Sequence, residues 1–469
     1  MADIKDLLDG ALSDRECITL LKDKTVKVPL WTGKVGLVNE YDPTKHPVMD
    51  KQLYPDLVRN NGVVRVTRIT LDLQRLATKR MSELVCGIPV KRIYHPETEA
   101  QKEIAAYMEA IFRRNRIDSV NTERCTMLFG GCEVMTLWYA VEQRNSLYGF
   151  ASDLKLRCRN FSPMLGDDLY PLFDEYGDMT AMSVAYTRKV GRRNVQFFDT
   201  YTEDRHIKWS DEAGEWRRVE DEGITLLKIP CIYAWRPTPI WEDTSRTVFE
   251  MEWALSRNGN YLRENSKPRF VVFADEIISY GDEGTPDSEF KAVMQYPKDA
   301  SATYVTWQQA TESLKLHIET LRSLFFTQLQ LPDWSYEKMS QQALSGESRK
   351  QMFIDAQLKV RDESGRLVEF FDREVNVVKA FLKLMLGSRY HAEIDALQVE
   401  NEITPYMIGD DKETIDNLLA ANGNQPLISQ RESIEYLGWS NDADKTLRDI
   451  QEQSKVEDWG LNEGLSPKE

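Results

Sequence analysis

Apolar residues recur three and four positions apart in four stretches of the chain, and this spacing is typical of an amphipathic helix. The first stretch, residues 97–117, has the apolar set Ile104, Tyr107, Met108 and Ile111. The others are residues 247–265, residues 308–330 and a stretch from about 350 to Leu386. Because each stretch is apolar on one face and polar on the other, we expect four helices that pack one side against a core.

The three later stretches carry signals for where each helix begins, ends and packs. Thr247 and Glu250 are spaced as a capping box, which predicts a helix start at Thr247. Pro332 ends the next helix because proline cannot continue its hydrogen-bonding pattern. Gly365 marks a candidate break in the last. The expected apolar faces are Val248, Met251, Leu255 and Leu262 in the first, Leu314, Ile318, Leu321, Phe325 and Leu329 in the second, and Leu367, Phe371, Val378, Phe381, Leu382 and Met385 in the third.

Between the helices predicted at residues 97–117 and 247–265, the sequence consists mainly of strand-like runs separated by turn residues. Gly130 and Gly131 predict a helix end at a left-handed position, followed by a strand over residues 132–140. Residues 150–236 read as strands joined by tight turns, two of them at Gly177 and Gly214. The N-terminal half is therefore predicted to be α+β.

A second strand-rich stretch, residues 267–306, separates two of the long helices, with its turn predicted at residues 281–286. The polar stretch 331–353 then interrupts the helical half, and residues 391–408 look extended. The last 60 or so residues predict short helices, with starts at Asp410 and Glu413, at Ser429 and Glu432, and at Asn441 or Asp442, and with ends at Gly423 and Gly438.

Composition narrows the functional classes. The chain has 469 residues, 41% of them hydrophobic, enough for roughly two to four packed units. Its 60 basic and 76 acidic side chains give a formal charge of −16, so a large phosphate-binding surface is not expected. Six dispersed cysteines predict no disulfide framework and a reducing compartment. The acidic N-terminus and the lack of a run of roughly 20 apolar residues predict a protein that is neither secreted nor membrane-inserted.

Standard catalytic signatures are absent from the sequence. It contains no glycine pattern for phosphates or dinucleotides, no H-E-x-x-H and no G-x-S-x-G. The five histidines are scattered singly, so they predict no metal site or general-base pair. Asp174, Glu175 and Asp178 are candidate metal ligands, but acids beside a turn more often accept hydrogen bonds from the local backbone. Neither Ser345 nor Ser348 in the polar stretch is interpreted as a nucleophile, and Ser345 or Gly346 is instead interpreted as a helix cap. No catalytic residue, metal or cofactor is predicted.

Four segments carry a likeness to a known family. They are KRMSELVCGIPVK at 79–91, MLFGGCEVMTLWY at 127–139, LLKIPCIYAWRP at 226–237 and LISQRESIEYLGWSNDADKTLRDIQEQ at 427–453. Together with the order of helix, β insert, helix, polar loop and helix, they resemble the portal proteins of tailed bacteriophages, specifically the siphophage-type portal family. The likeness spans nearly the whole chain.

The resemblance implies an α+β portal fold with seven parts. They are a wing over residues 1–246, a first stem helix over 247–266, a small β-rich clip over 267–307, a second stem helix over 308–333, a tunnel loop over 334–352, a long wing helix and returning wing strand over 353–408, and a short helical crown over 409–469. Longer family members have a longer crown, so the contacts of this crown stay open.

The resemblance also implies a function that needs no catalysis. Copies of the chain would form a ring, a dodecamer, at one capsid vertex, through which terminase drives double-stranded DNA and from which the tail draws it. The implied partners are the other copies, the major capsid protein, the terminase large subunit, the head–tail connector or adaptor, and DNA passing without sequence recognition. The implied location is the virion, after assembly in the host cytoplasm, with no membrane contact.

Three sets of residues follow from this likeness. The tunnel loop would bring near the DNA the residues Trp334, Ser335, Tyr336, Glu337, Lys338, Met339, Ser340, Gln341 and Gln342. The second stem helix would turn toward the lumen or the surrounding capsid the residues Lys315, His317 and Arg322. The clip would contact terminase and the connector through Asp282, Glu283, Asp287 and Glu289. The acidic character of the chain suits a conduit, because a basic lining would hold a polyanion.

Two other classes of protein stay open. One is a metal-dependent DNA-processing enzyme, such as a nuclease, which would hold a divalent ion with Asp174, Glu175 and Asp178. The other is a different structural part of a virion, such as a connector or capsid subunit. The enzyme predicts magnesium-dependent cleavage that Asp174→Ala abolishes, whereas a portal protein predicts no turnover.

Overall fold

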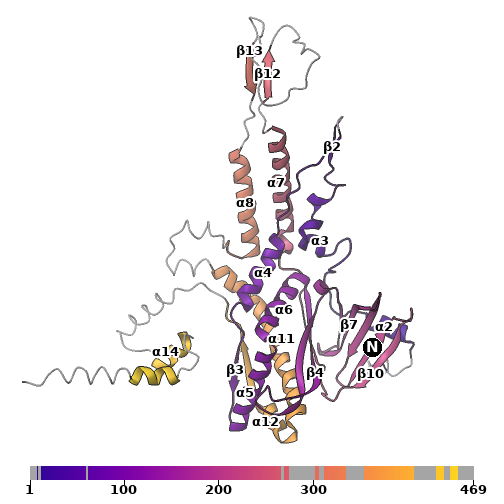
Figure 1. The fold of residues 1–469 in the computed structure, drawn as a ribbon, viewed down its shortest axis with the longest axis vertical. Helices are drawn as coiled ribbons and strands as arrows, with labels where there is room; N and C mark the ends of the chain where they lie inside the picture. The colour runs from indigo at the N-terminus through magenta and orange to yellow at the C-terminus, as the bar shows by residue number, and fades with distance from the viewer. Residues whose placement is uncertain are drawn as a thin grey trace, which may run out of the picture. The chain divides into compact units, whose positions relative to one another are not determined.

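The computed structural model describes residues 8, 12–59, 62–265, 269–273, 301–305, 311–333, 353–405, 429–437 and 444–452. The described residues form both helices and strands, with the strands from β4 (Glu133–Asn145) to β11 (Cys231–Trp235) in succession and the longest helices after them, which confirms the predicted α+β class (Figure 1). The chain divides into two compact units, one of residues 1–335 and 353–406 and the other of residues 336–352 and 407–469.

The first unit holds nine of the α-helices among the described residues. They are α2 (Asp14–Leu21), α3 (Val38–Tyr41), α4 (Leu73–Cys86), α5 (Glu99–Arg114), α6 (Ile117–Gly131), α7 (Ser245–Asn265), α8 (Thr311–Leu329), α11 (Ile354–Leu386) and α12 (His391–Ala396). Short 3-10 turns are η1 (Pro43–Lys45), η2 (Pro47–Met49), η3 (Pro163–Leu165), η4 (Glu242–Thr244) and η5 (Ser388–Tyr390).

Among the described residues, the strands of the first unit form five antiparallel sheets. They are β1 (Leu57–Arg59), β2 (Gly62–Val64), β3 (Lys91–His95), β4 (Glu133–Asn145), β5 (Ser152–Phe161), β6 (Asp168–Phe173), β7 (Met179–Val190), β8 (Arg193–Tyr201), β9 (Arg205–Ser210), β10 (Arg217–Gly223), β11 (Cys231–Trp235), β12 (Arg269–Phe273), β13 (Ser301–Val305) and β14 (Gln398–Glu402). The largest sheet has the order β10-β9-β8-β7-β6 and the next β11-β4-β5, while β1 with β2, β12 with β13, and β14 with β3 form pairs.

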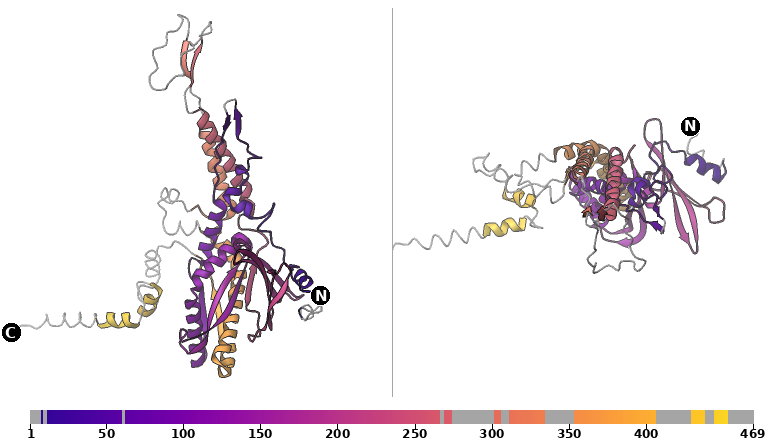
Figure 2. Two further views of the ribbon diagram at one scale, coloured as in Figure 1. Left: turned by 45° about the vertical axis from the view of Figure 1, so that its right-hand side comes forward. Right: turned by 90° about the horizontal axis from the view of Figure 1, so that it is seen from above.

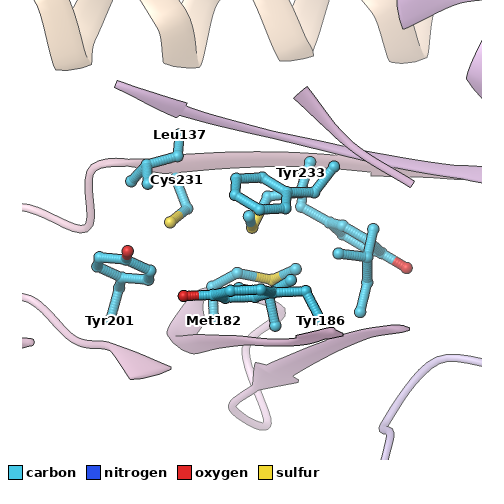
Figure 3. Close-up of a cluster of buried hydrophobic side chains, with 10 residues drawn as sticks. Leu137, Met182, Tyr186, Tyr201, Cys231 and Tyr233 are labelled. Carbon is cyan, nitrogen blue, oxygen red and sulfur yellow. The ribbon is translucent and has the colours of Figure 1, made fainter. Parts of the chain in front are cut away.

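The two larger sheets pack face to face around an apolar core. Figure 3 shows Leu137, Cys231 and Tyr233 from the three-stranded sheet opposite Met182, Tyr186 and Tyr201 from the five-stranded sheet. All of them are buried, as inward-facing residues of two stacked sheets should be. The tight turns predicted at Gly177 and Gly214 are confirmed, since both glycines have positive φ.

Helix α2 covers the other face of the five-stranded sheet. Ser13 and Glu16 form a capping box at its start. Ile18 and Leu21 of this helix pack against Trp209 in β9. The N-terminal segment is therefore tied to the sheet through an apolar face, which neither the helical stretches nor the family likeness had indicated.

A buried ion pair joins α11 to α6 and β4. Arg124 and Glu374 are both fully buried, and they meet through two hydrogen bonds of 2.5 and 3.0 Å. Trp138 Nε1 donates a third, of 2.9 Å, to Glu374. Removing one partner of such a pair leaves a buried charge uncompensated, which typically costs about 3–5 kcal/mol. This cluster fixes α11 against the three-stranded sheet.

The glycine pair Gly130-Gly131 does not end α6 in the predicted way. Both glycines are helical, and Cys132 is the residue that adopts the left-handed conformation, with φ 63°. The glycines are needed for space: a Cβ on Gly131 would lie 2.7 Å from Met164 Cγ in η3. The predicted order of helix and strand is confirmed, but the physical role of the glycines was wrong.

Three further predictions about helix boundaries were wrong. Helix α7 begins at Ser245, so Thr247 lies inside the helix and donates to Gln328 instead of forming a capping box. Helix α11 runs unbroken through Gly365, because buried residues on both sides hold it against the core. Residues 391–408 are not wholly extended: α12 precedes β14, which returns to pair with β3.

The second unit is described at residues 429–437 and 444–452. Helix α14 (Gln430–Leu437) begins at the predicted capping box, in which Ser429 and Glu432 bond each other's backbone N–H at 2.8 and 3.2 Å. Residues 444–452 are also helical. The predicted helix signals at Asp410, Glu413, Gly423, Gly438, Asn441 and Asp442 lie outside the described residues, as does the turn predicted at residues 281–286.

Candidate functional site

Helices α7 and α8 form an antiparallel pair, which Figures 1 and 2 show side by side. Thr247 near the start of α7 donates a 3.2 Å hydrogen bond to Gln328 near the end of α8. The predicted apolar stripe of α8 is confirmed as its least exposed side, with Phe325 and Leu329 buried. The hairpin of β12 and β13 lies between the two helices in sequence.

The foot of α7 is held by a buried polar contact that has no local sequence signal. His46 Nδ1 lies 2.7 Å from Glu252 Oε1, and both side chains are fully buried. His46 Nε2 lies 2.7 Å from the Glu40 carbonyl, which can only accept. Burial alone would lower the pKa of the His46 imidazole, but the hydrogen bond and charge of Glu252 outweigh burial and raise that pKa. Both ring nitrogens of His46 face oxygen acceptors, an arrangement that favours the doubly protonated imidazolium.

An extended segment runs along α7 above this contact. Leu71 N–H donates to Glu252 at 2.7 Å, and Ile69 N–H donates to Ser256 at 2.8 Å. Gly259 allows the close approach, since a Cβ there would lie 2.9 Å from Thr67 Cγ2. These α7 positions are spaced by four and three residues, so they share one face. That face accepts the segment's backbone groups.

The end of α8 and the start of α11 are fixed to each other. Lys359 of α11 donates a 2.5 Å hydrogen bond to the carbonyl of Leu329, the last residue of α8. Burial lowers the pKa of the Lys359 ammonium to about 8, and the charge of Arg236 adds to that effect. Leu331 and Phe353 are both buried. Buried residues therefore lie on both sides of the predicted tunnel loop, and they hold the end of α8 and the start of α11 in place.

The predicted charged residues of α8 lie on its surface, each near an acid. Lys315 is 3.8 Å from Glu319 on the same helix, and His317 is 4.0 Å from Glu250 of α7. Arg322 makes a 3.0 Å ion pair with Asp333. All three are exposed, as a role facing a lumen or a capsid requires, but exposed pairs of this kind contribute little stability.

Two of the predicted site groups lie outside the described residues. One is the tunnel loop set Trp334, Ser335, Tyr336, Glu337, Lys338, Met339, Ser340, Gln341 and Gln342, and the other is the clip set Asp282, Glu283, Asp287 and Glu289.

The acids considered for metal binding occupy a turn between β6 and β7. Asp174 Oδ1 accepts hydrogen bonds from the backbone N–H of Tyr176 and of Asp178, at 2.9 and 2.8 Å. Among the residues that the structure describes, no group of three or more His, Cys, Asp or Glu side chains is placed to hold a metal ion. Asp174 therefore stabilises the turn.

A cleft of about 760 Å³ opens between this turn, β11 and α11. Its lining mixes aromatic side chains, among them Phe173, Trp235 and Phe370, with charged ones that include Arg366 and Arg373. Arg373 is paired with Glu369 at 2.6 Å. The cleft brings no nucleophile or general-base pair together.

Comparison with known proteins gives the family. Residues 34–458 match the model of the phage portal proteins of the SPP1 Gp6-like type. The chain belongs to this phage portal protein family, a structural family without enzymatic function. The likeness stated from the sequence is thereby confirmed.

Two solved structures share a more distant likeness. A chain from the neck of an empty gene transfer agent particle, computed with C6 symmetry, has 10% identity and a TM-score of 0.41, covering 78% of this chain and 89% of its own. A chain from the virion of a native gene transfer agent particle has 10% identity and a TM-score of 0.40, covering 90% and 98%. At these scores neither likeness bears on function. None of the curated proteins compared with the chain matches it.

None of the helices in the described ranges is both long enough and apolar enough to cross a membrane.

Proposed function

We propose that this chain is the portal vertex protein of a tailed phage particle, where copies of it form a ring that conducts double-stranded DNA. The observation that carries the proposal is the family match, which extends over residues 34–458. The α7–α8 pair flanking the β12–β13 hairpin in sequence supports it, because a projecting helical pair gives a subunit two side faces for neighbours in a ring.

The parts of the chain take the roles that the family likeness implied. Helices α7 and α8 are the stem helices, and residues 267–307 with β12 and β13 are the clip. The two packed sheets, α11 and β14 form the wing, and residues 409–469 form the crown. Because the flanking residues Leu331 and Phe353 are buried, the tunnel loop of residues 334–352 departs from fixed ends.

Passage of DNA requires contact without retention. Duplex DNA carries one negative charge per about 1.7 Å of axis, so each Lys or Arg along a channel adds salt-dependent binding. The formal charge of −16 and the acids beside Lys315 and Arg322 weaken such binding. Trp334 through Gln342 would then touch the moving duplex, and Lys315, His317 and Arg322 would face the lumen or the capsid.

The proposed partners act at different parts of the ring. Twelve copies close the ring, and the major capsid protein surrounds it at the vertex of the virion. The clip acids Asp282, Glu283, Asp287 and Glu289 dock first the terminase large subunit, during packaging, and then the head–tail connector through which DNA is ejected. Assembly takes place in the host cytoplasm.

Imaging of the purified full-length chain tests the proposal. Negative-stain images together with a solution mass should show a ring of twelve copies with a central hole of duplex width. Compact monomers without a hole, or magnesium-dependent cleavage of DNA lost in Asp174→Ala, would contradict it.

A further inference from the structure

The hairpin of β1 and β2 exposes apolar side chains on both of its faces. Val58 pairs with Val63, and Leu57 pairs with Val64. Because side chains alternate along a strand, these two pairs point to opposite faces. Val58 is 84% exposed and Val63 is 66% exposed, and the other pair is exposed as well. Apolar side chains in a strand are usually buried against a core. Neither apolar pair of this hairpin is buried in the single copy.

The base of this hairpin is fixed although its side chains are uncovered. Asp56 accepts a 3.1 Å hydrogen bond from Val66 N–H and makes a 2.9 Å ion pair with Arg68. Arg263 of α7 donates to the carbonyl of Arg65 at 2.7 Å. A two-stranded hairpin with no packed face is at best marginally stable in water. Its anchoring at a defined place therefore indicates a surface that a partner covers.

The hairpin and α8 lie on opposite sides of α7. The α7 residues that bond or closely approach the segment leading from the hairpin are Glu252, Ser256, Gly259 and Arg263, spaced by four, three and four. Thr247 and Glu250 approach α8 instead. At 3.6 residues per turn the two sets face in opposite directions. Figure 1 shows the same order, with α7 between α8 and the β1–β2 hairpin.

The face of α8 opposite its buried stripe, called its outer face, also carries an exposed apolar side chain. Leu316, 66% exposed, lies half a turn from the buried stripe that includes Phe325. Glu312 and Glu319, four residues before and three after Leu316, share its face, and both are exposed. This face therefore presents one exposed leucine between two glutamates, of which Glu319 also lies 3.8 Å from Lys315.

We infer that the β1–β2 hairpin of one copy packs against the outer face of α8 of the next copy, with Val58 and Val63 covering Leu316. The inference rests on the proposed ring. Two unlike surfaces on opposite sides of one helix pair are what a head-to-tail ring needs, because every copy offers one surface and receives the other. A partner of a different kind would need only one of them.

Charge favours the same pairing. Arg65, directly after β2, and Lys51, before β1, are exposed on the hairpin side. Glu312 and Glu319 flank Leu316 on the α8 side. Opposite charges around an apolar centre fix the register of an interface and disfavour contact between two like surfaces. Two hairpins or two α8 faces would instead bring like charges together.

Cross-linking in the full-length chain tests the contact. Val58→Cys and Leu316→Cys are combined, and a short bismaleimide is added to the assembled protein. We expect a ladder of covalent multimers on a denaturing gel, since each copy links to two neighbours. The single variants Val58→Cys and Leu316→Cys should give no ladder, and neither should Leu316→Cys combined with Val190→Cys on the exposed part of β7. Dimers from Val58→Cys alone would show a hairpin–hairpin contact and overturn the inference.

A charge substitution separates this contact from the ring itself. Val58→Asp with Val63→Asp should abolish the ring in mass measurements and leave a folded subunit whose far-ultraviolet circular dichroism matches the wild type, because both side chains are exposed in the single copy. Val35→Asp, at an exposed valine outside the hairpin, should leave the ring intact. A wild-type chain that stays monomeric overturns both the ring and the contact. The contact alone is overturned if the wild type forms a ring, the Val58→Asp, Val63→Asp variant still forms it, and the Val58→Cys, Leu316→Cys variant gives no ladder.

Discussion

The His46–Glu252 contact joins the foot of α7 to the residues before α4. His46 faces a carboxylate on one nitrogen and a carbonyl on the other, both at 2.7 Å, so the imidazolium satisfies the site better than either neutral tautomer. The folded-state pKa of His46 is raised. Protonated His46 therefore contributes its full stabilisation below the ordinary histidine pKa of 6.5. This stabilisation is lost as the pH rises through the raised folded-state pKa of His46.

Glu252→Gln is expected to lower the unfolding free energy by about 1–3 kcal/mol near pH 6, because Gln can still accept from Leu71 N–H but cannot pair with an imidazolium. The difference from wild type should shrink at alkaline pH. Urea unfolding at two pH values measures it. Glu400→Gln is the matched control, since it removes an exposed pair with His95 and should change little at either pH. A loss that is equal at both pH values would contradict the charged contact.

Contacts of this kind could not be predicted from the sequence. His46 and Glu252 are 206 positions apart, and Arg124 and Glu374 are 250 apart. A single histidine or glutamate looks the same in the sequence whether it is buried or exposed. Only the tertiary fold determines which of the two it is. The capping box at Ser429 and Glu432 was predictable because both of its partners lie within one helical turn.

At the scale of elements, the sequence predicted which segments are helices more successfully than it predicted the structural roles of single glycines within them. The buried stripe of α8 was correct because a spacing of three and four is set by helix geometry alone. The glycines at 130 and 131 and at 365 were misinterpreted because conformational freedom was assumed to be their function. Their surroundings, which the sequence does not contain, give them different roles.

Two glycine substitutions distinguish those roles. Gly131→Ala should lower the unfolding free energy by about 1–3 kcal/mol, because the added Cβ would meet Met164 Cγ at 2.7 Å. Gly365→Ala should raise it by about 0.5–1 kcal/mol, since the site is helical and nothing lies within 4 Å of the added atom. Urea midpoints of the two variants measure the contrast. Adding Met164→Ala to Gly131→Ala should recover part of the loss, and equal effects of the two glycine changes would contradict this account.

At the scale of the whole molecule, the fold class and the element order could be predicted from the sequence, while the surfaces proposed to meet in a ring could not. The family likeness followed from ordered segments spread over nearly the whole chain, and the match over residues 34–458 confirms it. The exposed β1–β2 hairpin could not be found in this way, because Leu57, Val58, Val63 and Val64 have the composition of an ordinary buried strand pair. Only their exposure in a single copy points to a neighbour.

In the proposed conduit the segment between α8 and α11 needs particular side chains, whereas a simple connection needs only a sufficient length of chain. Replacing residues 335–342 by glycine and serine at equal length keeps the distance between the buried ends at Leu331 and Phe353. If Tyr336, Lys338 and Met339 act on the passing duplex, rings should form normally and DNA packaging should be lost. Ring formation is measured by mass and imaging, and packaging by protection of DNA from nuclease in assembled particles.

The outcome separates a channel element from a linker because the glycine–serine replacement changes only the side chains, whereas a deletion changes both the side chains and the length. Deletion of residues 335–342 shortens the connection and should also block packaging, but from this result alone strain in the ring could be the cause. The glycine–serine replacement removes the side chains without shortening the chain. Normal packaging in that replacement would show that the segment only joins α8 to α11, and the side chains that meet the DNA would then have to lie elsewhere, with exposed Lys315 and Arg322 the next to be substituted.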